Sequence, residues 1–326
     1  MKEKIALPRI AFFAGLLALT LPAANTMAET TLRVGHFPNI THTQALVAHA
    51  LSRQGKGVFE RHLGGDVKIE WYVYNAGPSA MEAIFAKSID LTYVGPNPAI
   101  NAYAKSRGAE IRIVAGSADG GAALIVHADS PLKAPADFRG KTIATPQLGN
   151  TQDVTARAWL AAGGLKITQA GGDAQVLPTA NPDQLSLFKQ KQLDAVWTVE
   201  PWVSRLEMEA NGKVLVDDHT SITTVLVARA AFLAESRELV AKFVAAHREL
   251  TAWIKNNPQE AQRLVREELL AETRTDVRPE LIARAWQRIV LTTDVSTEAL
   301  NAFVASAQAA GFLRNAPDMG RLIEKP

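Results

Sequence analysis

Five short loops of this chain combine small polar side chains with the starts of expected helices, and none contains Lys or Arg. They span residues 36–43, 75–79, 94–101, 145–153 and 196–204. A helix N-terminus carries unpaired N–H groups and a partial positive charge, so it can hold an anion without a basic side chain. A sulfonate stays ionised and accepts several such bonds, whereas a phosphonate dianion more naturally calls for Arg or Lys. If the ligand is an anion, the loops therefore predict that neutral donors bind it.

The candidate ligand contacts in these loops are neutral donors, aromatic rings and one carboxylate. Tryptophan rings in a cleft would stack on an apolar or cationic part of the ligand. Glu200, with Asp153, would bind an ammonium group if the ligand is an aminosulfonate. The ten candidates are His36, Phe37, Asn39, Ser79, Asn97, Asn150, Thr151, Trp197, Glu200 and Trp202.

Each candidate also has a purely structural interpretation that the sequence leaves open. Ser79 and Asn150 are typical helix caps, and Asn97 between two prolines is typical of a turn. Trp197 and Trp202 are equally well explained as core residues.

Metal and catalytic chemistry are not expected. A zinc site built from His36, His42 and His49 is conceivable, but metal ligands usually lie closer in sequence and no acid lies near them. No Gly-x-Ser-x-Gly or Ser/His/acid arrangement of a serine hydrolase is evident. We therefore expect no cofactor, no metal and no enzyme activity.

Residues 77–95 and 181–199 form two copies of one structural unit, 104 residues apart without a gap. Each copy has a turn with Pro, an expected capping residue (Ser79 or Asp183), an apolar helical stripe and an Asp that leads into a short strand. A repeat of this size is too long for a solenoid unit and indicates two similar lobes with a cleft between them.

The rest of the chain alternates strands with helices, which predicts an α/β fold with mainly parallel sheets. A capping box of Ser79 and Glu82 predicts a helix start at that serine. Apolar residues at spacings of one, three and four predict late amphipathic helices over 239–254 and 281–290. The expected strands cover 31–35, 67–74, 111–115, 123–126, 141–144, 176–178 and 223–228.

Residues 1–28 have the pattern of a secretory signal peptide cleaved after about Ala28. A basic start precedes an apolar run from Ile10 to Leu21, too short to span a bilayer, and a small-residue exit follows. The net charge of +2 lies entirely in this segment, so the rest is formally neutral and no basic stripe suggests nucleic acid. The chain has no Cys, hence no disulfide and no lipidated cysteine anchor.

The order of these pieces resembles a periplasmic solute-binding protein of the type II fold, within the nitrate/sulfonate/taurine branch of ABC-importer binding proteins. Four segments carry the resemblance: Arg33 to Asn39, Gly77 to Ala83, Asp90 to Pro98, and Gly140 to Ala144 with its following loop. Trp197 to Trp202 matches the family's late cleft segment more loosely.

The resemblance implies a two-lobed α/β protein that closes on a small anion and delivers it to an ABC permease and its ATPase. We expect a monomer in the periplasm, with an alkanesulfonate or taurine as the leading ligand. The expected organisation is a signal peptide over 1–28, a first lobe over 29–125, a second lobe over 126–222, and a return to the first lobe with C-terminal helices over 223–326.

Alternatives remain at this stage. The same fold could bind nitrate, an aromatic acid, a phosphonate or a thiamine-precursor pyrimidine, or could serve a sensor. The thiamine-pyrimidine synthases that share the fold use a Cys-rich motif, and this chain has no Cys.

Overall fold

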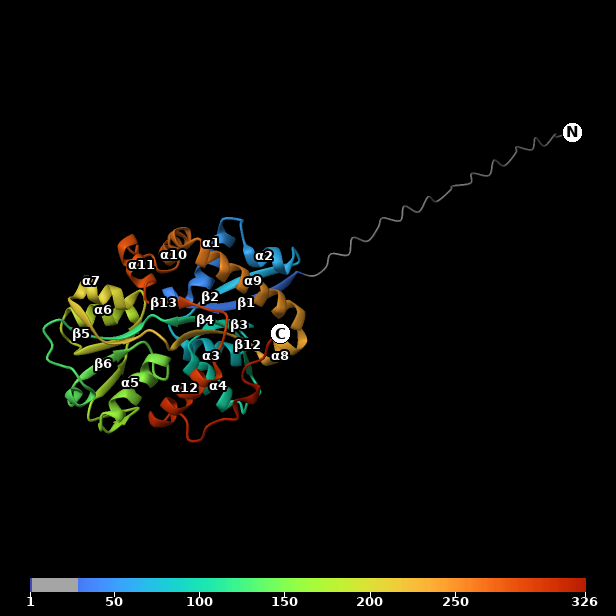
Figure 1. Cartoon of the computed structure of the whole chain (residues 1–326). Coiled ribbons are helices and arrows are strands. Elements are labelled where there is room, and N and C mark those ends of the chain that lie inside the picture. Colours follow the sequence, from blue (N-terminus) through green and yellow to red (C-terminus); the bar gives the residue numbers. More distant parts are fainter. Residues whose placement is uncertain (2–28) are drawn as a thin grey trace.

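The computed structural model describes Met1 and residues 29–326; the expected signal peptide and its cleavage after Ala28 therefore lie outside the described residues. Two lobes, each built on its own sheet, make up the described chain (Figure 1). The first and last parts of the chain share one lobe, and the middle part forms the other. None of the described helices is long and apolar enough to cross a bilayer.

The first lobe has a six-stranded sheet in the order β13-β4-β12-β3-β1-β2. Helices cover both faces, with an apolar cluster on each side. The strands are β1 (Thr30–His36), β2 (Val67–Val73), β3 (Leu91–Val94), β4 (Ile111–Gly120), β12 (Ile222–Arg229) and β13 (Ile289–Leu291). One face carries α1 (Thr43–Arg53), α2 (Val58–Leu63), α9 (Arg237–Asn256), α10 (Pro258–Thr273) and α11 (Pro279–Trp286); the other carries α3 (Gly77–Phe85), α4 (Pro96–Lys105) and α12 (Thr297–Ala309).

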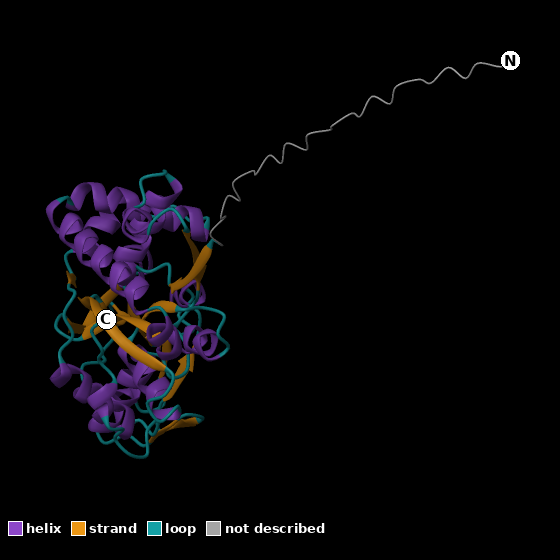
Figure 2. Ribbon diagram, turned by 90° about the vertical axis from the view of Figure 1, so that its right-hand side faces the viewer, coloured by secondary structure: helices purple, strands orange, loops and turns teal. Residues whose placement is uncertain are grey.

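The second lobe has a five-stranded sheet in the order β11-β5-β10-β6-β9. Its strands are β5 (Ala122–His127), β6 (Thr142–Thr145), β9 (Gln175–Pro178), β10 (Ala195–Val199) and β11 (Gly212–Asp218). Helix α5 (Thr151–Ala162) packs on one face, and α6 (Asn181–Lys189) with α7 (Trp202–Ala210) packs on the other. Figure 2, in which the first lobe faces the viewer, shows helices above and below the strands of that lobe. The short α8 (Ala230–Glu235) joins the first apolar cluster of the first lobe through Phe232 and Leu233, and the β7 (Ile167–Thr168)–β8 (Gly171–Gly172) hairpin forms a separate small sheet.

Most strands of each sheet run in one direction, as the sequence predicts, although five of the nine strand pairs in the two sheets are antiparallel. β1 runs parallel to β2 and β3, and β6 runs parallel to β9 and β10. The strands that follow each change of lobe, β5 and β12, run antiparallel to their neighbours. The two-lobed α/β fold inferred from the sequence is therefore the fold observed.

The chain passes between the lobes at two short connections. β4 ends and β5 begins around Gly120 and Gly121, whose φ angles of 69° and 74° are strained for any residue with a side chain. The chain returns through residues 219–221, between β11 and β12. The lobe boundary expected after residue 125 thus falls inside β5, because one apolar stretch of sequence is divided only by this glycine pair.

The two copies of the repeat fold alike. Each contains a helix with Pro in its first turn, a lysine with positive φ (Lys87 at 58°, Lys191 at 57°) and an aspartate before the strand. Asp90 accepts a bond from Arg33 N at 3.1 Å, and Asp194 accepts one from Thr142 N at 2.9 Å. In both lobes the aspartate therefore ties the repeat to a neighbouring parallel strand.

Three local predictions were wrong, and prolines explain two of them. Ser79 and Asp183 do not cap helices: α3 and α6 begin two residues earlier, at Gly77 and Asn181, because a proline in the first turn favours that start. The turn expected around Asn97 is instead the first turn of α4, which begins at Pro96. The helix expected over 281–290 ends at Trp286, and its last residues pair with β4 as β13.

Candidate functional site

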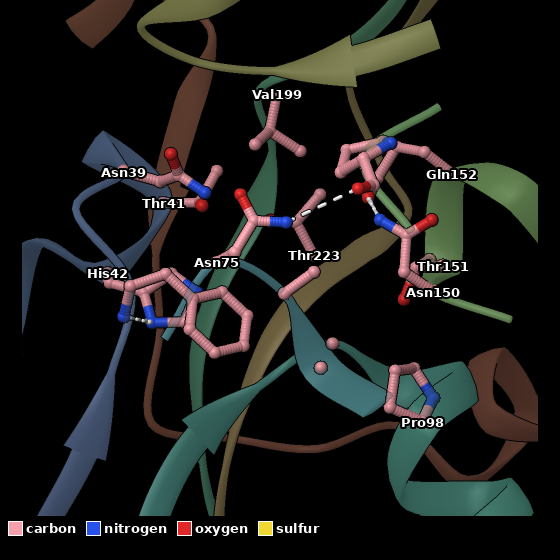
Figure 3. Close-up of a pocket in the computed structure, with 15 residues that line it drawn as sticks. Asn39, Thr41, His42, Asn75, Pro98, Asn150, Thr151, Gln152, Val199 and Thr223 are labelled. Carbon is pink, nitrogen blue, oxygen red and sulfur yellow. Dashed lines mark hydrogen bonds between the residues drawn. The ribbon is translucent and has the colours of Figure 1, made fainter. Parts of the chain in front are cut away.

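A small cavity lies between the lobes, at the carboxyl ends of β1, β2 and β3 on one side and of β6 and β10 on the other. Figure 3 shows side chains from both lobes converging on it. Its volume is about 30 Å³. It is lined by Phe37, Asn39, Thr41, His42, Asn75, Ala76, Gly77, Gly95, Pro98, Pro146, Asn150, Thr151, Gln152, Val199 and Thr223.

Three helices start at the wall of this cavity. Gly77 is the first residue of α3, Gly95 precedes α4, and Thr151 is the first residue of α5. The first backbone N–H groups of a helix have no partner within the helix, and the helix dipole adds partial positive charge there. Pro78, Pro96 and Pro98 have no N–H, so the donors at these starts are fewer, but the helix dipoles still give the cavity the electrostatics of an anion site, with one helix contributed by the second lobe.

No lining residue of this cavity is a Lys, Arg, Asp or Glu. His42, its one titratable group, is fully buried, and burial holds its pKa well below the usual value, with His36 nearby adding to the effect. His42 Nδ1 accepts a bond from Phe37 N at 3.3 Å, which leaves the proton on Nε2. The lining of this cavity therefore offers a ligand only neutral dipoles.

Asn150 and Thr151 have different roles at the start of α5. Asn150 caps the helix, because its Oδ1 accepts from Asp153 N at 2.9 Å. Thr151 Oγ1 is buried against the cavity and has no hydrogen-bond partner among the described residues. A buried hydroxyl without a partner costs free energy, so Thr151 is the side chain most ready to bind a ligand.

A second, larger cavity of about 420 Å³ adjoins the first through Asn39 and Asn75, which line both. Trp202 lies in its wall, donates its indole N–H to Asn39 Oδ1 at 3.1 Å across the lobes, and has Arg205 over its ring at 4.8 Å. Its other lining residues include Leu185, Val277, Thr273 and Lys189. This space is partly apolar and suits the remainder of a ligand whose head occupies the small cavity.

Five of the ten sequence candidates line the two cavities: Phe37, Asn39, Asn150, Thr151 and Trp202. The other five lie elsewhere. His36 lies at the end of β1, where its Nε2 is 2.6 Å from Glu272 Oε1. Ser79 pairs with Gln147 of the second lobe at 3.0 Å.

Asn97, Trp197 and Glu200 are buried in protein contacts. Asn97 Nδ2 donates to Phe303 O on α12 at 3.3 Å, and Trp197 packs in the core of the second lobe. Glu200 accepts from Arg288 and from the hydroxyl of Ser204, both at 2.9 Å.

The two carboxylates considered for an ammonium group are both occupied. Burial raises the pKa of Glu200, while its bonds to Ser204 and Arg288 oppose that shift. Asp153 is fully buried and pairs with Arg157 at 3.1 Å on the next turn of α5. Among the described residues, neither cavity has a carboxylate in its lining.

Sequence reasoning missed several lining residues. Asn75, Thr41 and Gln152 sit in loops that the sequence singled out, but nothing in their types set them apart there. Thr223 reaches the cavity from the returning strand β12, and Arg205 lies one residue beyond the last loop considered. These side chains meet at the cavities only because the two lobes pack against each other.

Comparisons with known proteins agree with this architecture. The profile of the NMT1-like family matches residues 25–269. A protein of Brucella abortus (strain 2308), provisionally named a binding protein, is 28% identical over 263 residues, which cover 78% of this chain and 76% of the relative. A protein of Escherichia coli (strain K12), provisionally named an aliphatic sulfonates-binding protein, is 28% identical over 63% of this chain and 60% of its own length.

A solved structure shares the fold at lower identity. The alkanesulfonate-binding protein from Xanthomonas axonopodis pv. citri, solved with bound MOPS, superposes with a TM-score of 0.72 at 19% identity, over 91% of this chain and 99% of its own.

Proposed function

Because the chain belongs to the NMT1-like family, we propose that it is the substrate-binding component of an ABC importer in the periplasm. In this role it captures a small organic anion between its lobes and delivers it to a membrane permease driven by an ATPase. The observation that carries the proposal is the cavity at three helix starts, which has no charged side chain in its lining and is lined by residues of both lobes. A cavity of this kind suits an ionised monoanion that needs only neutral donors.

Within this class we propose an alkanesulfonate as the ligand. The sulfonate would occupy the small cavity and the alkyl chain would extend past Asn39 towards Trp202. The sulfonate-binding names of two of the compared proteins support this choice. Taurine is the weaker candidate, because Glu200 and Asp153 are engaged by Arg288 and Arg157 and leave no carboxylate for an ammonium group.

The small cavity also supports a second candidate, nitrate. A volume of about 30 Å³ is little more than the space that about two water-sized groups require. A planar inorganic anion would fit there without any use of the larger cavity.

A panel of anions tests these proposals by thermal shift and calorimetry. It contains methanesulfonate, butanesulfonate, hexanesulfonate, taurine, nitrate, sulfate and a phosphonate. A ligand at 100 times its dissociation constant should add about 2.7 kcal/mol to the free energy of unfolding. We expect affinity to rise from methanesulfonate to hexanesulfonate, as each added CH₂ enters the larger cavity.

Two results would change the assignment. Binding of nitrate with no response to any sulfonate would replace the alkanesulfonate by the inorganic anion. No response to any anion by the folded protein would overturn anion capture itself.

A further inference from the structure

Two histidines and two glutamates form a cluster in the first lobe, between the end of β1 and the helices α1 and α10. His36 is the last residue of β1, His49 lies on α1, and Glu268 and Glu272 lie one turn apart on α10. We call these four residues the His–Glu cluster. They come from three elements, and the glutamates are more than 200 positions from the histidines in sequence.

The donor atoms of the cluster lie close together. One ligand atom each from His36, His49 and Glu272 falls within 4.8 Å of the other two. His36 Nε2 is 2.6 Å from Glu272 Oε1, and His49 Nδ1 is 3.2 Å from the same oxygen. Glu268 Oε1 is 2.7 Å from His49 Nδ1. His36, His49 and Glu272 therefore converge on one small volume, and Glu268 adjoins it through its contact with His49.

The cluster is buried, and its internal hydrogen bonds leave two of its polar atoms without a partner. The exposed fractions of the side chains are 0% for His36, 15% for His49, 1% for Glu268 and 2% for Glu272. Glu272 Oε2 and His36 Nδ1 are buried without a hydrogen-bond partner among the described residues. Unpaired polar atoms at such depth are costly.

The charges of the cluster are also unbalanced. Two buried carboxylates face one fixed cation, Arg53, which reaches Glu268 at 3.1 Å and is itself half exposed. Glu272 has no arginine or lysine partner among the described residues. A buried carboxylate needs a positive partner, and a divalent cation bound by both histidines would supply it.

We propose that the His–Glu cluster is a zinc site. Two imidazole nitrogens and two carboxylate groups are a donor set that Zn²⁺ accepts in tetrahedral geometry. Tetrahedral ligands at about 2.0–2.1 Å from zinc lie about 3.3 Å from one another. The contacts of 2.6 and 2.7 Å would therefore lengthen by about 0.6 Å as the metal replaces the shared protons.

A metal at this position would connect the site to the ligand cavity. It would cross-link β1, α1 and α10, and the cavity loop that contains Phe37, Asn39 and His42 starts directly after His36. Zinc would thus hold the base of that loop and stabilise the first lobe. This proposal stands independently of which anion the cavity binds.

Zinc binding by the purified protein, free of any histidine tag and stripped with a chelator, tests the proposal. We expect calorimetry to give one Zn²⁺ per chain, a higher Tm with zinc, and a tetrahedral absorption spectrum when Co²⁺ replaces it. His49→Gln should weaken zinc binding at least tenfold and remove the gain in Tm. The partly exposed His49 is the cluster member whose replacement disturbs the fold least.

Two controls keep the result interpretable. His62→Gln removes a histidine from an exposed His62–Glu249 pair at 2.7 Å and should leave zinc binding unchanged. If His49→Gln lowers the Tm of the apo protein, Glu272→Gln provides a second removal of a ligand. Failure of the wild-type protein to bind one zinc per chain, or equal binding by wild type and both cluster variants, would overturn the proposal.

Discussion

Thr151 shows at the scale of one residue how the cavity is prepared for a ligand. The side chain of its neighbour Asn150 caps the helix, whereas the Thr151 hydroxyl is buried and has no hydrogen-bond partner among the described residues. The Cβ that Gly95 lacks would come within 2.3 Å of this hydroxyl, so the glycine leaves the space that Thr151 occupies. The first lobe is therefore shaped to receive this side chain of the second.

We expect Thr151→Val to weaken binding of the anion about 10- to 100-fold. The substitution keeps the shape and removes a hydrogen bond to a charged ligand, which contributes about 1.5–3 kcal/mol. Calorimetry with the best sulfonate of the panel measures the change. Thr297→Val, at an exposed site on α12, is the matched control and should bind as the wild type does. Unchanged affinity in Thr151→Val would remove Thr151 from the site.

His247 makes the first lobe sensitive to acid. It is fully buried, its Nε2 lies 2.8 Å from Gly116 O, and its Nδ1 lies 3.0 Å from the hydroxyl of Tyr93. Burial lowers its pKa from 6.5 to about 4. The unfolded chain therefore takes up this proton at a higher pH than the folded protein does.

The stabilising contribution of neutral His247 is complete above pH 6.5 and is lost as the pH falls towards 4. The difference in pKa corresponds to about 3 kcal/mol of unfolding free energy. Urea unfolding between pH 8 and pH 4.5 should show this decline in the wild type and a smaller one in His247→Gln. Parallel curves for the two proteins would show that another group causes the acid sensitivity.

At the scale of elements, the repeated helix–strand unit uses one aspartate for the same purpose in two environments. Asp90 is 1% exposed and pairs with Arg33 and Arg229 at 2.9 and 3.1 Å. Asp194 is 34% exposed and pairs with Lys141 at 3.1 Å. We therefore expect the two equivalent aspartates to contribute unequally to the free energy of unfolding.

We expect Asp90→Ala to lower the free energy of unfolding by about 3 kcal/mol, because it leaves the largely buried Arg229 without its partner. Asp194→Ala should cost about 1 kcal/mol, since its ion pair is solvated and the main loss is the bond from Thr142 N. Chemical denaturation of the two variants side by side measures the contrast. Similar losses would show that the strand contact, and not burial of the charge, sets the energy.

At the scale of the whole molecule, contacts between the lobes hold the cleft closed. Gln147 donates to Ser79 across the cleft, and Ile40 N donates to Glu200 O at 2.9 Å. Arg288, from the first lobe, reaches Glu200 and Glu207 of the second at 2.9 Å. Apolar contacts join these polar ones, because Val154 of α5 packs against Ala307 and Ala310 at the end of α12.

Ser79→Ala should weaken anion binding about fivefold although Ser79 does not line the cavity. It removes one hydrogen bond of about 1 kcal/mol that exists only with the lobes closed. Stopped-flow binding should show faster dissociation and an unchanged association rate. A loss as large as that of Thr151→Val would instead indicate a direct contact between Ser79 and the anion.

Particular residues show how far the sequence reaches. The repeat, the alternation of strands and helices and the resemblance predicted two lobes with mainly parallel sheets, because these depend on local periodicity and spacing. Asn150 as a helix cap followed from its type and its place before an apolar helix. Ser79 and Asn97 were misplaced, because prolines start α3 and α4 early and both side chains bond to protein groups, Gln147 and Phe303, instead of lining the cavity.

The sequence by itself determined the α/β class, the two similar units and the loops without Lys or Arg. Only the tertiary structure decided which loop residues lie together at the cavities, including Thr223 and Arg205. It showed that Glu200 and Asp153 form ion pairs with arginines. It also brought Glu268 and Glu272 to His36 and His49, where the sequence shows no acid nearby. The physical reason is that periodicity records which face of an element is buried, whereas the partners on that face come from distant parts of the chain.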